Sequence, residues 1–93
     1  MTRLLTDAEI STRLEGLEWN REGERIVNNW TFPDFAEAIS FVNRVAGAAE
    51  AADHHPDILV HGRRKVRLSL TNHSVGGLTA IDFEMARKFD AAV

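Results

Sequence analysis

The sequence contains no cysteine and no tyrosine, and only two prolines and six glycines interrupt its 93 residues. Without cysteine the chain forms no disulfide and offers no thiolate to a metal, which excludes the disulfide-rich class of small domains. No apolar run approaches the roughly 20 residues that a bilayer-spanning helix needs, and the opening residues lack the apolar core of a secretory signal. We therefore expect a cytoplasmic protein that binds no membrane.

An excess of positive charge is also missing, because 11 Lys and Arg residues face 14 Asp and Glu residues, for a net charge of -3. Nucleic acids and acidic lipids generally need a basic surface, so neither is an expected partner. The short basic run from Arg63 to Arg67 is typical of a solvated hairpin tip. The hydrophobic content of 44% argues against disorder, and we expect one domain over residues 1–93.

Local sequence patterns predict the order α-β-β-α-β-β-α. Thr6 with Glu9, and Thr79 with Asp82, have the spacing of a capping box, which marks the start of a helix. Apolar residues recur at helical spacing after each box, which predicts a short first helix and a last helix near residues 79–89. Alternating apolar residues around turn signals at Gly23 and near Gly62 predict two hairpins, over residues 17–30 and 57–71.

A long helix is expected between the two hairpins. Pro33 and Asp34 suit its first turn, and Pro56 forces it to end at about His54. Its predicted apolar stripe consists of Phe35, Ile39, Val42, Val45, Ala46 and Ala49. The predicted fold class is therefore α+β, with a four-stranded antiparallel sheet and helices packed on one face.

Two adjacent histidines lie at the predicted end of the long helix, in the stretch EAADHHPDI, residues 50–58. The dipole at a helix C-terminus favours a cation, so it favours the protonated form of His54. If the last turn is helical, Glu50 lies four residues before His54 on the same face, where its carboxylate acts in the same direction. We therefore expect His54 to be an acid with Glu50 as its electrostatic support.

A third histidine, His73, follows the second hairpin and precedes the glycine-rich loop SVGGLT. Loops held by a rigid scaffold often carry reactive groups, so a site that combines His73 with His54 and His55 is the leading hypothesis. Two alternatives stay open. In the first, the histidines are ordinary surface or core residues with no special role, which suits His61 at its hairpin turn best. In the second alternative the histidines bind zinc, but the sequence has no cysteine and no HExxH spacing to support a zinc site.

The sequence resembles the pterin-4a-carbinolamine dehydratases, also called 4a-hydroxytetrahydrobiopterin dehydratases. The similarity runs through LEWNREGERI, FPDFAEAISFVNRVA and GGLTAIDFEMA, and the family fold has the order of elements predicted above. The resemblance implies two groups of site residues. The catalytic group is His54, His55 and His73. The substrate-binding or supporting group is Glu50, Asp53, Pro56 and Asp82.

The resemblance implies a dehydratase, a carbon–oxygen lyase that converts 4a-hydroxytetrahydropterin to quinonoid dihydropterin and so recycles a tetrahydrobiopterin-type cofactor. One imidazole protonates the leaving hydroxyl and another accepts a proton from a ring nitrogen, since both forms of histidine exist near neutral pH. His54 is expected to be the principal acid and His73 its acid/base partner, with these two roles exchangeable. His55 is expected to orient the pterin. The reaction needs no metal and no organic cofactor.

The partners implied by the resemblance are a pterin substrate, a pterin-dependent aromatic amino acid hydroxylase, and further copies of this chain, as a homodimer through the sheets or a homotetramer. The alternative function is that of a non-catalytic adaptor, either a dimerisation cofactor for a transcription factor or an assembly factor for another enzyme. An adaptor has no chemical need for three histidines, which favours the enzyme. The sequence departs from the motif in the second hairpin, where Arg63 replaces an aromatic residue and one residue is added.

Overall fold

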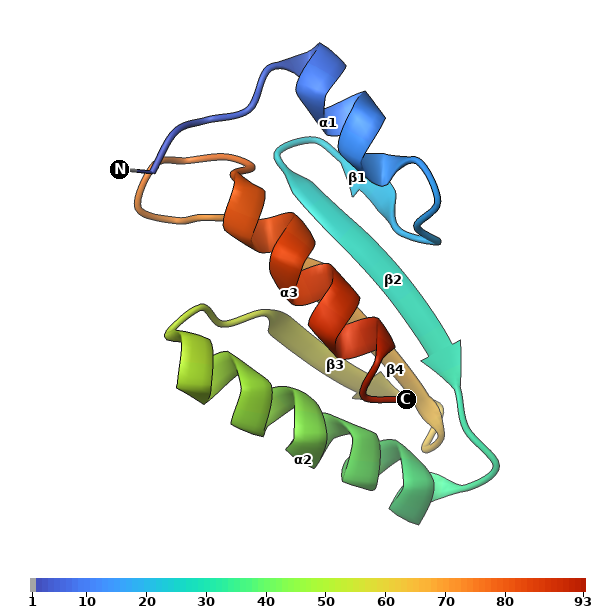
Figure 1. Ribbon diagram of the computed structural model, residues 1–93. Helices are drawn as coiled ribbons and strands as arrows, with labels where there is room; N and C mark the ends of the chain where they lie inside the picture. Colours follow the sequence, from blue (N-terminus) through green and yellow to red (C-terminus); the bar gives the residue numbers. More distant parts are fainter. Residues whose placement is uncertain (1) are drawn as a thin grey trace.

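The computed structural model describes residues 2–93, which form three helices and a four-stranded antiparallel sheet. The helices lie on one face of the sheet (Figure 1). The elements are α1 (Asp7–Leu14), β1 (Asn20–Glu22), β2 (Arg25–Thr31), α2 (Phe35–Ala52), β3 (Asp57–His61), β4 (Lys65–Leu70) and α3 (Ala80–Asp90). The strands lie in the order β1-β2-β4-β3. The predicted fold class and element order are confirmed. Within residues 2–93, no helix has the length and apolar character needed to cross a membrane.

Both predicted capping boxes are present. At the start of α1, the N–H of Glu9 donates to Thr6 Oγ1 and the N–H of Thr6 donates to Glu9 Oε1, at 3.1 and 2.9 Å. Hydrogen bonds from Arg3 and from the Thr6 backbone lower the pKa of Glu9 to about 2. At the start of α3, the N–H of Thr79 donates to Asp82 Oδ2 at 2.8 Å. Both helices therefore begin where the sequence predicts.

The long helix α2 follows Asp34, whose side chain accepts a hydrogen bond from the N–H of Glu37. The prediction of its apolar stripe was partly wrong, because Phe35 is 54% exposed and Ala46 is also exposed. Phe35 is the first residue of the helix and precedes the first buried turn. Ala46 follows a buried valine and so points about 100° further around the helix. The residues that α2 buries are Ala38, Phe41, Val45 and Ala49.

One hydrophobic core lies between the sheet and the helices. The sheet contributes the fully buried Ile26, Val66, Leu68 and Leu70. Buried helical residues of this core include Ile10, Phe41, Val45, Phe83, Met85 and Phe89. Ile26 is paired with Leu70 and Trp30 with Val66, so the expectation that Ile26 and Trp30 share a face is confirmed. The core holds α2 and α3 next to each other across the sheet (Figure 1).

Asp90, the last residue of α3, accepts a hydrogen bond from Nε1 of Trp19 at 3.0 Å. Desolvation by burial raises the pKa of Asp90, and the charge of Glu18 acts in the same direction, while the bond from Trp19 opposes both. A carboxyl group whose pKa is raised by folding opposes folding in its ionised form. That opposition is present at neutral pH and disappears as the pH falls below the ordinary value of 3.8.

We therefore expect Asp90→Asn to raise the melting temperature at pH 7. The amide oxygen keeps an acceptor for Trp19, and the substitution removes only the desolvated charge. At pH 3 the carboxyl group is protonated in both the folded and the unfolded chain, so the two proteins are expected to melt together. Circular dichroism melts at the two pH values measure this difference, and a melting temperature that is equal or lower at pH 7 contradicts the role assigned to Asp90.

Candidate active site

The two adjacent histidines leave α2 through a left-handed turn. Asp53 has φ 50° and ψ 42°, and its N–H bonds the carbonyl of Glu50 at 3.2 Å. The N–H of His54 bonds the carbonyl of Ala49 at 3.1 Å. This is the Schellman pattern, which satisfies the last carbonyl groups of a helix and ends it. His54 and His55 therefore lie beyond the helix, and the Asp53 side chain is exposed to solvent.

The side chain of His54 reaches the first turn of α3. Its Nε2 lies 2.6 Å from Oδ1 of Asp82, although the two residues are 28 positions apart in the sequence. The His54 side chain is 12% exposed and that of Asp82 is 0% exposed. A carboxylate in this position fixes the orientation of the imidazole, because one of its oxygens occupies hydrogen-bond distance from a ring nitrogen. Asp82 is thus the charge partner of His54.

Glu50 pairs with His55 and not with His54. Its Oε1 lies 2.6 Å from Nε2 of His55, and the two side chains are 77% and 52% exposed. The prediction that Glu50 supports His54 is therefore wrong. It assumed a helical spacing of four residues up to His54, whereas α2 ends at Ala52 and the chain turns left-handed at Asp53. An exposed pair of this kind contributes about 0.2–1 kcal/mol, so Glu50 orients His55 and leaves it accessible.

Asp82 serves the helix and the histidine with different oxygen atoms. Oδ2 accepts the N–H of Thr79 at 2.8 Å and the Thr79 hydroxyl at 3.2 Å, while Oδ1 faces His54. A buried carboxylate is tolerated only when hydrogen bonds and a charge partner replace its water. The capping-box spacing identified Asp82 as the residue that caps α3. Nothing in that spacing indicated that its second oxygen would face His54.

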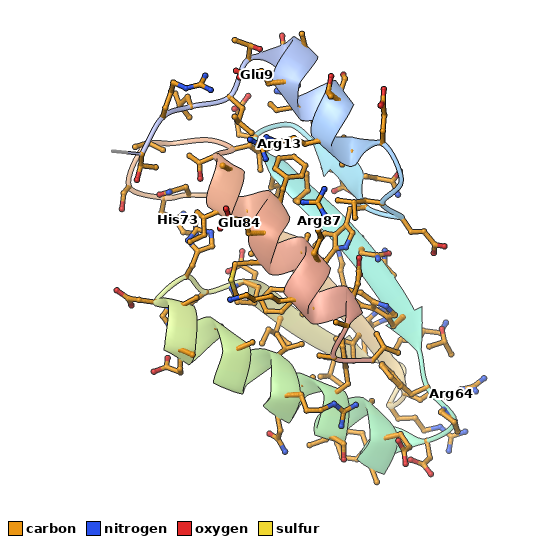
Figure 2. The ribbon with its side chains drawn as sticks, viewed as in Figure 1. Glu9, Arg13, Arg64, His73, Glu84 and Arg87 are labelled. Carbon is orange, nitrogen blue, oxygen red and sulfur yellow. The ribbon has the colours of Figure 1, made fainter. Side chains whose placement is uncertain are left out.

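His73 lies in the loop between β4 and α3 and is exposed. Figure 2 shows it at the end of the molecule where α3 begins and α2 ends, far from Arg64 beside the tip of the second hairpin. The loop of His73 is joined to the start of α3 by a bond from Asn72 Nδ2 to Thr79 Oγ1 at 3.4 Å. His54, His55 and the His73 loop therefore share one end of the fold.

The departures from the motif lie away from this end. Arg63 occupies the tip of the second hairpin, with φ 57°, and β3 separates that tip from the histidines. His61 ends β3 near the same tip and is exposed, so it lies outside the cluster. Arg63 therefore lies outside the immediate surroundings of His54 and His55.

The cluster provides the groups that general acid–base catalysis uses. It combines a shielded imidazole beside a buried carboxylate, an exposed imidazole beside an exposed carboxylate, and a third imidazole on a loop. Such groups transfer protons to and from a substrate when they lie within hydrogen-bond reach of it. Among residues 2–93, no group of three or more His, Asp or Glu side chains is arranged to hold a metal ion.

The helices therefore lie on one face of the sheet, and the histidines lie at the end of the fold where α2 ends and α3 begins. A sequence model of the family described as Pterin 4 alpha carbinolamine dehydratase matches residues 3–92. The chain belongs to this family.

Curated relatives and solved structures agree with this assignment. A protein of Roseiflexus castenholzii, provisionally described as a pterin-4-alpha-carbinolamine dehydratase, is 49% identical over the full length of both chains. A protein of Picosynechococcus with the same provisional description is 46% identical and covers 97% of this chain and 98% of its own. The crystal structure of a transcriptional coactivator/pterin dehydratase from Brucella melitensis has a TM-score of 0.91 at 34% identity, covering 97% and 98% of the two chains.

A more distant structure shares the fold alone. It is a pterin dehydratase-like protein identified as a RuBisCO assembly factor in the alpha-carboxysome, with a TM-score of 0.69 at 21% identity, covering 83% of this chain and 90% of its own.

Proposed function

We propose that this chain removes water from a 4a-hydroxytetrahydropterin to give the quinonoid dihydropterin. The observation that carries the proposal is the pair of His54 with the buried Asp82, in a chain that belongs to a dehydratase family. Hydroxide is a poor leaving group, so the reaction needs a proton donor beside the departing oxygen. An imidazole backed by a buried carboxylate, and shielded from most solvent, is suited to that task.

In the proposed mechanism, protonated His54 donates its proton to the C4a hydroxyl, which leaves as water. The lone pair of the neighbouring ring nitrogen moves toward C4a as the C–O bond breaks. Neutral His73 then removes the proton bound to nitrogen, which gives the quinonoid product. His73 then releases its proton to solvent and His54 takes one up, so both imidazoles return to their starting forms. His55, oriented by Glu50, binds the pterin, while Asp53 and Pro56 contribute by ending α2 at this point.

The test is a coupled dehydration assay. A pterin-dependent aromatic amino acid hydroxylase, which we infer to be the kind of enzyme that supplies the substrate, generates the 4a-carbinolamine, and absorbance follows the quinonoid product. We expect this protein to raise the rate above that in buffer. The description of the Brucella melitensis protein joins dehydratase to transcriptional coactivator, so an adaptor is the second candidate. No increase in rate would overturn the catalytic function and favour the adaptor.

We also infer that two copies of the chain associate through β3, which is an edge strand of the sheet. Its Ile58 and Leu59 are 38% and 53% exposed. An edge strand with exposed apolar side chains is a surface that strand pairing with a second copy can cover.

Sedimentation at micromolar concentration is expected to show at least a dimer. Leu59→Lys places a charge on the edge strand and is expected to shift the protein toward the monomer. Val93→Lys is the matched control, because Val93 is 61% exposed and lies at the end of the chain, outside the sheet. A strict monomer before any substitution contradicts the inference.

A further inference from the structure

The loop that carries His73 is closed around a single residue, Asn72. The N–H of Asn72 donates to the carbonyl of Gly77 at 3.0 Å, and its own carbonyl accepts the N–H of Gly76 at 2.9 Å. Its side-chain Oδ1 accepts the N–H of Ser74 at 3.1 Å. His73 is the next residue along the chain and is exposed, so its position is set mainly by the backbone that Asn72 holds.

The amide nitrogen of Asn72 faces away from this loop and toward α3. Nδ2 donates to Thr79 Oγ1 at 3.4 Å, and the Thr79 hydroxyl lies 3.2 Å from Asp82 Oδ2. The direction of these bonds follows from their chemistry. The carboxylate oxygen only accepts, so the hydroxyl proton points to Asp82 and leaves a lone pair for Asn72. Thr79 is 1% exposed, which shields this chain of bonds from water.

The chain of bonds continues to the proposed acid. Asp82 uses Oδ2 for Thr79 and Oδ1 for Nε2 of His54, at 2.6 Å. Asn72, Thr79 and Asp82 therefore connect the residue before His73 to His54 through buried or partly buried groups. Neither imidazole needs to contact the other for their spacing to be maintained.

We propose that Asn72 is a positioning residue that holds the His73 loop and the His54–Asp82 pair in one hydrogen-bonded frame, and so sets the spacing of the two proton-transferring imidazoles. The role rests on the proposed dehydratase function. It needs one acceptor and one donor on the same short side chain, which an asparagine supplies and neither alanine nor aspartate does. Proton transfer depends steeply on distance, and a displacement of about 1 Å can cost about 10²-fold in rate.

The deciding variant is Asn72→Asp. It keeps an acceptor for Ser74 and so keeps the loop closed, but it presents an acceptor to Thr79 where a donor stood, and it adds a carboxylate near Asp82. We expect kcat to fall at least 10-fold, with a smaller change in KM. The added negative charge favours protonated histidine, so activity should persist to higher pH. Asn72→Ala should lower kcat without that shift of the pH profile.

A second readout does not depend on activity. The imidazole nitrogen resonances of His54, followed by NMR, should change in Asn72→Asp, because the Thr79 hydroxyl can turn from Asp82 to the new carboxylate. Asn43→Asp, on the exposed side of α2, is the matched control and should leave both readouts unchanged. If the unchanged protein is active and Asn72→Asp keeps its kcat, pH profile and His54 resonances, the positioning role is overturned while the function stands. If the protein without substitutions is inactive, the proposed function fails. If Asn72→Asp then also leaves the His54 resonances as they were, the hydrogen-bonded frame is overturned as well.

Discussion

Replacing His54 by glutamine is expected to lower the dehydration rate by about 10²–10⁴-fold, or about 3–5 kcal/mol of barrier, because the leaving hydroxyl loses its proton donor. Glutamine is the informative replacement, since its side-chain nitrogen can still donate to the buried Asp82 while the amide cannot act as an acid. The loss should appear in kcat, measured in the coupled dehydration assay, and the melting temperature should fall less than in His54→Ala, because the hydrogen bond to Asp82 is kept.

His73→Ala is expected to lose most of the turnover as well, because it removes the proposed acceptor of the second proton. His61→Ala is the matched control, since His61 is an exposed histidine of the same chain that lies at the far end of β3. Its turnover should remain unchanged. If neither His54→Gln nor His73→Ala slows dehydration, these two residues do not transfer the protons.

Replacing His54 by alanine is expected to cost about 3 kcal/mol of stability, because it leaves the carboxylate of Asp82 buried without its charge partner. Asp82 is 0% exposed and would keep only the donors of Thr79. Adding Asp82→Asn to this variant removes the buried charge and should recover part of the loss. Denaturant unfolding of the single and double variants gives the free energies as a double-mutant cycle.

The control for this stability effect is the neighbouring histidine–carboxylate pair, which has the same distance between nitrogen and oxygen. His55 and Glu50 are also 2.6 Å apart, but both side chains are more than half exposed. His55→Ala should therefore change the free energy of unfolding by less than about 1 kcal/mol. Equal losses for His54→Ala and His55→Ala would show that burial of the carboxylate does not set the cost.

Local chemistry predicted the elements of this fold well. The capping pairs at Thr6 and Thr79, the break at Pro56 and the alternation in β4 each act over a few residues, so their outcome can be worked out without knowing the fold. The predicted stripe of α2 was less accurate, because the burial of Phe35 depends on where the sheet lies relative to the first turn of the helix.

The site required information that local patterns do not contain. His54, His55 and His73 could be identified as candidates, together with Asp82 as a cap, but the partner of each histidine could not. Because Asp53 adopts the left-handed conformation, the adjacent imidazoles of His54 and His55 face different carboxylates. No distinctive sequence pattern shows when an aspartate adopts that conformation. The role of Asn72 could not be predicted either, because it depends on the two elements that the side chain of Asn72 connects.

The two histidine–carboxylate pairs differ in how much of the chain must be ordered before they form. Glu50 and His55 are five residues apart, so their pair forms once the end of α2 has formed. His54 and Asp82 are 28 residues apart, and β3, β4 and the loop of His73 lie between them. Closing the longer segment costs more conformational entropy and requires α3 to dock. We therefore expect the pair of His55 with Glu50 to form earlier in folding than the pair of His54 with Asp82.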